Sequence, residues 1–110
     1  EQQNYSLIIT HVLQYLESHY QQDLSLSEVA KVVSVNPSYL SSLIKKETGK
    51  NFIDIIIEAR LEHAKKLLQN PCHRINEVAD LSGFKDYAYF YQTFKKHVGL
   101  SPKEYRNQFL

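Results

Sequence analysis

A chain of 110 residues fits one domain, or two very small lobes that share a core, and is too short for most multidomain enzymes. With 43% hydrophobic and 23% charged residues, and only three glycines and three prolines, the composition is globular and favours helix over disorder or an all-β sandwich. The net charge of +1 is low for a nucleic-acid binder. However, residues 1–59 carry 4 positive and 7 negative side chains, whereas residues 60–110 carry 9 positive and 5 negative ones. We therefore expect the second part of the chain to face the phosphates.

Few features bear on cellular location. No apolar run approaches the ~20 residues that a bilayer span requires, and nothing resembles a signal peptide, so no membrane partner is expected. Cys72 is the only cysteine, which excludes an internal disulfide and favours a reducing cytoplasm. Because Glu1 is not Met and the first four residues are polar, we expect a fragment of a longer protein whose regulatory part lies outside it.

The first two helices are predicted from spacing and capping. Apolar residues near helical spacing predict a helix from Tyr5 to His19, which we interpret as packing scaffold. Ser25 and Glu28 form a capping-box sequence, in which the serine hydroxyl accepts from an early backbone N–H and the glutamate reaches back to the cap. A second, short helix should therefore begin at Leu26 and end near Ser34.

The third and fourth helices have clear end signals. Asn36 suits the N-cap of the third helix, and Pro37 suits its first position, where a missing N–H costs nothing. Gly49 is the natural stop of this helix. A longer connecting helix follows from about residue 52 to residue 69, and the pair 70–71, Asn-Pro, ends it.

Three further helices fill the rest of the chain. A short helix over 75–82 closes at Gly83, a helix over 86–98 starts from the cap Asp86, and a second capping box at 101–104 opens the last helix. The sequence thus predicts seven helices and no strand, which is an all-α fold.

Part of the sequence recurs. Before a turn in each copy, the two copies are offset by 49 residues, so that Leu26, Glu28, Val29 and Ala30 correspond to Ile75, Glu77, Val78 and Ala79. After the turn the offset is 50, which pairs Asn36 with Asp86, Tyr39 with Tyr89, Leu40 with Phe90, Ile44 with Phe94, Lys45–Lys46 with Lys95–Lys96 and Gly49 with Gly99. Two short helices joined by a tight turn form a helix-turn-helix unit, so the repeat predicts two such units around the connecting helix.

The motifs of both units follow one family pattern. They are Arg60–Leu61, Ala64, Leu67–Leu68, Gly83–Phe84, Tyr89–Phe90, Phe94–Lys95–Lys96, Gly99, Ser101–Pro102 and Tyr105–Arg106. With this spacing, the stretch from Leu24 to Arg106 resembles the AraC/XylS family of bacterial transcription regulators, in particular their C-terminal DNA-binding domain. The resemblance implies a bipartite, homeodomain-like domain whose helices near 37–48 and 86–98 enter successive major grooves on one face of DNA.

The expected organisation has three parts. They are an N-terminal helix with the first helix-turn-helix unit over 5–50, the connecting helix over 51–70, and the second unit over 71–108. Two recognition faces held ~34 Å apart would match one turn of DNA. Among relatives, such a domain follows either a ligand-binding module or the phosphorylated receiver of a two-component response regulator, and the sequence leaves both open.

Helical periodicity separates inward from outward residues in the two recognition helices. The inward residues are Leu40, Leu43 and Ile44 in the first and Phe90 and Phe94 in the second. The outward residues are Ser38, Ser41, Ser42 and Lys45 in the first and Ala88, Tyr91, Gln92 and Lys95 in the second. Short polar side chains near base edges, with cations for flanking phosphates, suit a helix that enters a groove about 12 Å wide.

The candidate base contacts are Ser38, Ser41, Ser42, Tyr87, Ala88, Tyr91 and Gln92. Gln92 is the strongest candidate, because a glutamine amide bonds bidentately to adenine and because the position of Gln92 matches a base-contacting site in the family. The alternative is that Gln92 is a solvated amide on the helix surface. Ser38 and Ser42 occupy the matching sites of the first unit, where many relatives carry larger or basic residues, and they either bond to bases or form neutral helix surface. We therefore expect the first unit to contribute positioning more than base discrimination.

The tyrosines and lysines of the recognition helices each have alternative roles. Tyr87 and Tyr91 either pack against thymine methyls or sugar, donate to phosphate, or fill core, and we expect core burial less for Tyr91 than for Tyr89. The candidate phosphate contacts are Lys45, Lys46, Lys95 and Lys96. These lysines also suit helix C-termini through the helix dipole, but only phosphate contact makes a complex salt-dependent.

Other chemistry is not expected. Arg60 lies in the apolar stripe of the connecting helix, where an arginine normally needs a carboxylate partner, and we interpret it as a structural link between the two units. Four of the five histidines and the only cysteine do not form a metal-ligand spacing, so neither metal nor cofactor is expected; these residues are His11, His19, His63, His73 and Cys72.

Double-stranded DNA is therefore the expected partner, with RNA polymerase as a further candidate and a regulatory domain outside the fragment. The second hypothesis is a helical protein-interaction module, which the near-neutral charge favours. An enzyme ranks third, because the chain lacks a glycine-rich phosphate loop, a metal cluster and a recognisable nucleophile–base pair.

Overall fold

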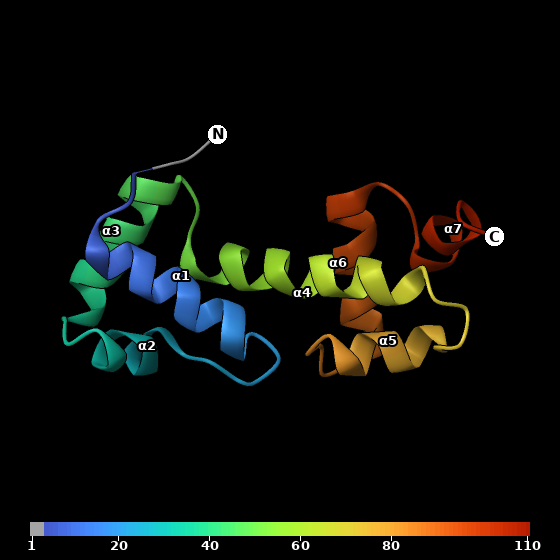
Figure 1. The fold of residues 1–110 in the computed structure, drawn as a ribbon, viewed down its shortest axis with the longest axis horizontal. Coiled ribbons are helices and arrows are strands. Elements are labelled where there is room, and N and C mark those ends of the chain that lie inside the picture. Colours follow the sequence, from blue (N-terminus) through green and yellow to red (C-terminus); the bar gives the residue numbers. More distant parts are fainter. Residues whose placement is uncertain (1–3) are drawn as a thin grey trace. The chain divides into compact units, whose positions relative to one another are not determined.

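Seven helices and no strand make up residues 4–110, the part of the chain that the computed structural model describes (Figure 1). The helices are α1 (Leu7–His19), α2 (Leu26–Val32), α3 (Pro37–Thr48), α4 (Phe52–Leu68), α5 (Ile75–Leu81), α6 (Tyr87–Val98) and α7 (Pro102–Asn107). The all-α prediction is confirmed. The expectation drawn from Glu1 and the polar opening concerns positions that lie largely outside the described residues.

Side-chain caps set where the first two helices begin. The α1 helix begins at Leu7, two residues later than predicted, because Ser6 is its N-cap and the Ser6 hydroxyl accepts from the Ile9 N–H at 3.3 Å. In α2 the predicted capping box is confirmed. The Glu28 N–H donates to Ser25 Oγ at 3.1 Å, and the Ser25 N–H donates to Glu28 Oε1 at 3.0 Å.

The capping box of α7 is also confirmed. The Glu104 N–H donates to Ser101 Oγ at 3.1 Å, and the Ser101 N–H donates to Glu104 Oε1 at 2.9 Å. This backbone donor, helped by the serine hydroxyl, lowers the pKa of the Glu104 carboxyl. The stabilisation from the ionised carboxylate is therefore complete above its ordinary pKa and is lost as the pH falls through the lowered value.

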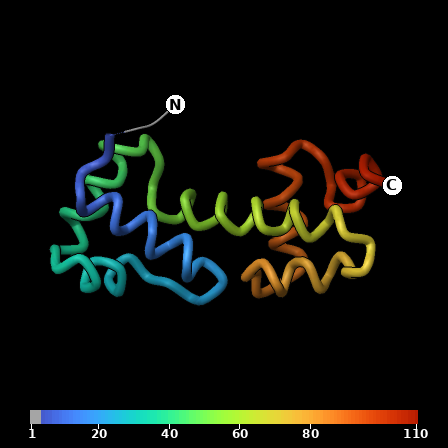
Figure 2. The backbone as a smooth tube through the Cα atoms, in the orientation of Figure 1, coloured from blue at the N-terminus to red at the C-terminus, as the bar shows by residue number. Residues whose placement is uncertain are grey.

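The chain turns between α2 and α3 (Figure 2). This turn is longer than predicted, because a Schellman motif ends α2 at Val32 and not near Ser34. The Ser34 N–H donates to the Lys31 carbonyl at 3.2 Å. The Val35 N–H donates to the Ala30 carbonyl at 3.0 Å. This motif needs a left-handed residue, and Ser34 supplies it with a φ of 58°. A side chain with a Cβ makes that conformation unfavourable.

The turn between α5 and α6 repeats these bonds 49 residues later. The Gly83 N–H donates to the Asp80 carbonyl at 3.1 Å, and the Phe84 N–H donates to the Ala79 carbonyl at 3.0 Å. Gly83 takes the left-handed position with a φ of 98°, which glycine adopts without steric cost. The two turns therefore have the same hydrogen bonds but different strain.

Two compact units divide the chain, one that ends at Ile57 and one that begins at Glu58, so the boundary lies inside α4. Each unit contains one helix-turn-helix pair, α2 with α3 in the first and α5 with α6 in the second. The division into 5–50, 51–70 and 71–108 stays a prediction.

The core of the first unit is almost entirely aliphatic. It consists of Ile9, Val12, Leu16, Val29, Ala30, Leu40, Ile44, Phe52 and Ile56. A polar contact adds to this packing, because the Ser6 N–H, at the start of α1, donates to Glu47 Oε1 on α3 at 2.8 Å. The α1 helix is therefore held to α3 by apolar burial and by a hydrogen bond.

The core of the second unit contains aromatic rings as well as aliphatic side chains. Its buried apolar residues include Leu61, Ala64, Leu68, Val78, Ala79, Phe84, Phe90 and Phe94. The ring of Phe90 lies 5.1 Å from that of Phe84 and 5.7 Å from that of Phe94, measured between centroids. The Tyr105 ring of α7 lies edge-on to Phe94 at 5.6 Å. These rings join the turn, α6 and α7 into one packed series.

Arg106 on α7 holds the connection between α4 and α5. Its Nε donates to the Leu68 carbonyl at 2.9 Å, and its Nη2 donates to the carbonyls of Asn70 at 3.2 Å and His73 at 2.6 Å. Leu68 is the last residue of α4, so one of these bonds satisfies a helix-end carbonyl. We refer to these three bonds as the Arg106 latch.

Ser34→Gly should stabilise the protein, because glycine adopts the left-handed conformation without strain. We expect a gain of about 0.5–1 kcal/mol in the free energy of unfolding, since ~1–2 kcal/mol of relieved strain exceeds the ~0.4–1 kcal/mol of added unfolded-state entropy. Gly83→Ala is the matched change and should cost about 1 kcal/mol or more. Urea unfolding measures both, and a Ser34→Gly protein less stable than the wild type would contradict this account of the turn.

Arg106→Lys should destabilise the protein by about 1–3 kcal/mol, because a single ammonium group cannot reproduce the planar set of donors that the three carbonyls accept. Arg74→Lys, at an exposed arginine of the same unit, is the matched control and should be nearly neutral. Urea unfolding measures the two free energies. Equal stability of the two variants would mean that the Arg106 latch contributes nothing.

Candidate nucleic-acid interface

The α3 helix exposes one face because the opposite face is anchored in the core. Leu40 and Ile44 lie one turn apart and are 0% and 1% exposed, and Leu43 beside them is half-buried, as predicted. Asn36 fixes the start of the helix, since its Oδ1 accepts from the Ser38 N–H at 2.7 Å. The predicted N-cap is therefore confirmed.

All the site candidates on α3 are exposed, and they are Ser38, Ser41, Ser42, Lys45 and Lys46. Lys45 Nζ donates to the Gly49 carbonyl at 3.3 Å, just beyond the end of the helix. Lys45 therefore stabilises the helix C-terminus, which is one of the two roles weighed for it. The α3 face consists of small hydroxyl groups followed by two cations.

The α6 helix is anchored in the same way. Phe90 and Phe94 lie one turn apart and are fully buried, as predicted, and Thr93 between them is 8% exposed. The Tyr89 N–H donates to Asp86 Oδ1 at 2.9 Å, which confirms Asp86 as the N-cap. The orientation of α6 about its own axis is thus fixed by two phenylalanines and its start by a carboxylate.

All the site candidates on α6 are exposed as well, and they are Tyr87, Ala88, Tyr91, Gln92, Lys95 and Lys96. The expectation that Tyr89 would be buried rather than Tyr91 is wrong, because Tyr89 is 48% exposed and Tyr91 is 38% exposed. The centroid of the Tyr87 ring lies 6.3 Å from that of Tyr91, and the two ring planes are inclined at 50°. Both residues therefore belong to the surface.

The two recognition faces have equivalent positions but different chemistry. With the offset of 50, Ser41 corresponds to Tyr91 and Ser42 corresponds to Gln92. A serine hydroxyl donates to or accepts from several bases, whereas a glutamine amide fits the donor–acceptor pair of adenine. The face of α6 thus has more capacity to discriminate between bases than the face of α3.

Arg60 contacts an aromatic ring of its own unit. Its guanidinium carbon lies 6.0 Å from the centroid of Phe84, at the outer limit of a cation–π contact. Phe84 is itself buried beside Phe90, so Arg60 packs against the edge of the aromatic core. Its role in linking the two units stays a prediction.

Two residues that hold the interface in place were not predicted. Glu47 binds the start of α1 across 41 positions, and no local pattern indicates such a contact. Arg106 binds carbonyls 33–38 positions away. The Tyr105–Arg106 motif marked Arg106 as part of the family pattern but did not reveal what its side chain binds.

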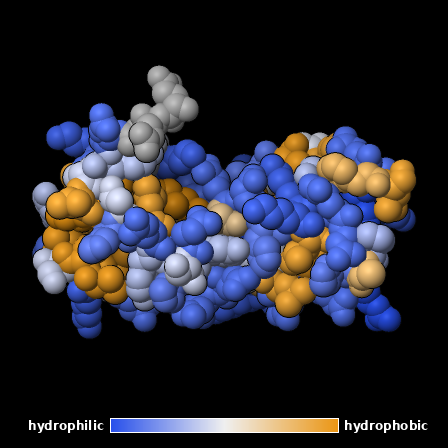
Figure 3. Space-filling view, viewed as in Figure 1, coloured by the Kyte–Doolittle hydropathy of each residue, from blue (hydrophilic) through white to orange (hydrophobic). Residues whose placement is uncertain are grey.

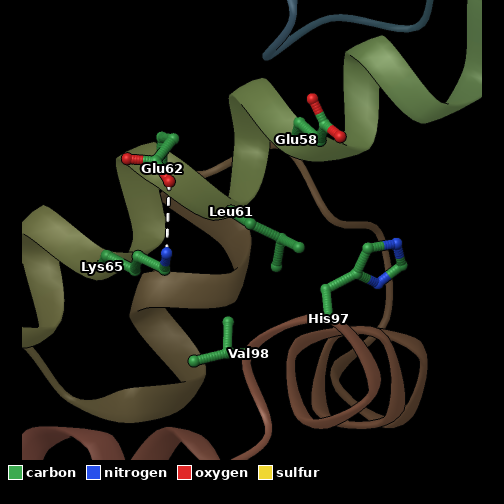
Figure 4. Close-up of a pocket in the computed structure, with 6 residues that line it drawn as sticks. All are labelled: Glu58, Leu61, Glu62, Lys65, His97 and Val98. Carbon is green, nitrogen blue, oxygen red and sulfur yellow. Dashed lines mark hydrogen bonds and ion pairs between the residues drawn. The ribbon is translucent and has the colours of Figure 1, made fainter. Parts of the chain in front are cut away.

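A small pocket lies on the second unit, between the α4 segment from Glu58 to Lys65 and the C-terminal end of α6 (Figure 4). Its lining consists of Glu58, Leu61, Glu62, Lys65, His97 and Val98. Glu62 pairs with Lys65 at 3.2 Å, and the pocket volume of about 270 Å³ is below the ~300–1,000 Å³ usual for small-molecule sites. The pocket is separate from the outward candidates of α6.

Metal ligation and membrane insertion find no support within residues 4–110. No group of three His, Cys, Asp or Glu side chains in this part of the chain is placed to hold a metal ion. None of the helices described is long and apolar enough to cross a membrane. On the face drawn in Figure 3, hydrophobic patches lie among hydrophilic residues on both units.

Comparison with known proteins gives consistent matches. Residues 29–108 match the family described as helix-turn-helix domain. The C-terminal domain of AraT, a response regulator from Geobacillus stearothermophilus, is 39% identical with a TM-score of 0.90, and the match covers 96% of this chain and 88% of that one. A transcriptional regulator from Chromobacterium violaceum, described as containing an AraC-type DNA-binding domain, is 28% identical with a TM-score of 0.86. This match covers 92% of this chain and 90% of that one.

The curated relatives are longer proteins. The lactose operon transcription activator of Staphylococcus xylosus is 32% identical over 101 residues, which is 92% of this chain and 36% of that protein. The chain spans between 34% and 39% of the length of three such relatives. The match to the family covers both helix-turn-helix units, in agreement with the internal repeat. The chain therefore belongs to the helix-turn-helix domain family, in the AraC-type group of bacterial transcription regulators.

Proposed function

We propose that this chain is the sequence-specific DNA-binding domain of a bacterial transcription regulator and that α3 and α6 enter successive major grooves. The observation that carries the proposal is the duplicated recognition helix. Each of the two helices buries two apolar side chains one turn apart and exposes a face that ends in a lysine pair. In α3 the rest of this face consists of three serines, and in α6 it includes Ala88, Tyr91 and Gln92. A helix with such a face fits a major groove about 12 Å wide.

The residues divide by the part of DNA that they reach. Gln92, Tyr91 and Ala88, on the outward face of α6, approach base edges, and Lys95 and Lys96 at the end of the helix approach phosphates. The equivalent residues of α3 take the same places in the other groove. They are Ser38, Ser41 and Ser42 near the bases and Lys45 and Lys46 near the phosphates. On this proposal α6 discriminates between bases and α3 mainly positions the domain.

The partners follow from the family. Double-stranded DNA is the direct partner, and relatives of which the matched region is only 34% and 36% support a regulatory domain in the full protein. RNA polymerase is the further partner that we propose for a transcription regulator of this type. The family is one of transcription regulators and not of enzymes, and we propose that the domain acts in the cytoplasm without a cofactor.

Gln92→Ala and Lys96→Ala should have different effects on binding. Loss of the amide should remove discrimination at one base position, by about 1–3 kcal/mol, because the bidentate contact is lost. Loss of the lysine should weaken all sequences alike. Selection from a random-sequence duplex pool, followed by titration of the selected site and of its single-base variants, measures both. Lys66→Ala, an exposed lysine on α4, is the control and should change neither. If neither Gln92→Ala nor Lys96→Ala affects binding, the docking of α6 is wrong.

Binding to a random-sequence duplex should weaken steeply as salt rises. The double change Lys95→Ala with Lys96→Ala should make the slope of log K against log salt shallower by about 2, because each phosphate contact contributes ~0.9. Fluorescence anisotropy over a range of salt concentrations measures the slope. The absence of binding at low salt would contradict the proposal and favour a helical protein-interaction module, the alternative that the net charge of +1 suggests.

A further inference from the structure

The exposed face of α6 combines an aromatic pair with an amide. Tyr87 and Tyr91 lie one turn apart, with ring centroids 6.3 Å apart and planes inclined at 50°. Gln92 follows Tyr91 directly and is also exposed. We call Tyr87, Tyr91 and Gln92, with Ala88 one turn before Gln92, the aromatic–amide surface. It has no counterpart in the first unit, where the positions equivalent to Ala88, Tyr91 and Gln92 are all serines.

The rings of this surface are held by the core of the unit. Tyr87 lies 6.1 Å from the fully buried Phe90, and Phe90 in turn contacts Phe84 and Phe94. Tyr91 is held against Tyr87, and its 38% exposure leaves part of the side chain open to a ligand. Rings that are already ordered lose little conformational entropy when they bind.

The surface matches two features that an A·T pair presents in the major groove. Thymine carries a C5 methyl, the only apolar group on a base edge there, and an ordered ring edge buries it. Adenine presents an N7 acceptor beside an N6 donor, which one glutamine amide satisfies bidentately. The single methyl of Ala88 leaves room beside the amide for the base edge to approach.

We propose, building on the DNA-binding function proposed above, that the aromatic–amide surface selects two neighbouring A·T pairs. Gln92 bonds to the adenine of one pair, and the Tyr91 ring, backed by Tyr87, packs on the thymine methyl of the next pair. The ring of Tyr91, and not its hydroxyl, makes this contact. The preference belongs to α6 alone, because the serines of α3 offer no apolar surface to a methyl group.

Base analogues that remove single groups test this inference. A duplex selected by the wild-type chain from a random-sequence pool is the probe, and the position where Gln92→Ala loses its preference marks the site of α6. Deoxyuridine in place of thymine at the neighbouring pair removes only the methyl and should weaken wild-type binding about fourfold, the loss expected for one buried methyl. Replacing adenine by 7-deazaadenine should weaken binding on the order of tenfold.

The variants separate the ring from its hydroxyl. Tyr91→Ala should bind thymine and deoxyuridine duplexes equally, whereas Tyr91→Phe should keep the fourfold preference for thymine. Ser41→Ala, the matched change in α3, should also keep it. Helix content by circular dichroism confirms that the variants are folded, and Tyr91→Phe keeps the test informative even if Tyr91→Ala is not.

Three outcomes would overturn the inference while leaving DNA binding intact. They are selection of G·C pairs at the α6 site, wild-type binding that is indifferent to the thymine methyl, and loss of the preference in Tyr91→Phe, which would assign the preference to the hydroxyl rather than to the ring. The absence of binding to every duplex in the pool would instead overturn the proposed function itself.

Discussion

Two buried side chains one turn apart determine how each recognition helix is presented. Leu40 and Ile44 have this role in α3, and Phe90 and Phe94 have it in α6. Helices of 12 residues are only marginally stable alone in water, so packing supplies most of their stability and also fixes their rotation about their own axes. Because rotation decides which side chains remain exposed, the composition of both faces depends on these four anchors.

The sequence predicted the features whose causes are local. The caps at Ser25, Asn36 and Asp86 and the stop at Gly49 each depend on a few adjacent residues, and the structure confirms all of them. The outward candidates follow from helical periodicity alone, and all of them are exposed. The start of α1 was two residues off because Ser6, a capping serine, stands within an apolar pattern that extends to Tyr5.

Features that depend on the tertiary fold could not be predicted from the sequence. The bonds of Glu47 and of the Arg106 latch join residues more than 30 positions apart, and neither partner has a local signal. The greater exposure of Tyr89 than of Tyr91 depends on tertiary packing, which periodicity does not determine. The bases that α3 and α6 would contact under the proposed function depend in addition on how each helix docks on DNA, which no local pattern in the sequence encodes.

The duplication has left one conformational inequality between the units. Ser34 and Gly83 occupy the same left-handed position of the same Schellman motif, but only Ser34 carries a Cβ. A strained turn opens more often, so the bond from the Val35 N–H should exchange its hydrogen with solvent faster than the equivalent bond from Phe84. The helix-turn-helix of the first unit should therefore open locally more often than that of the second.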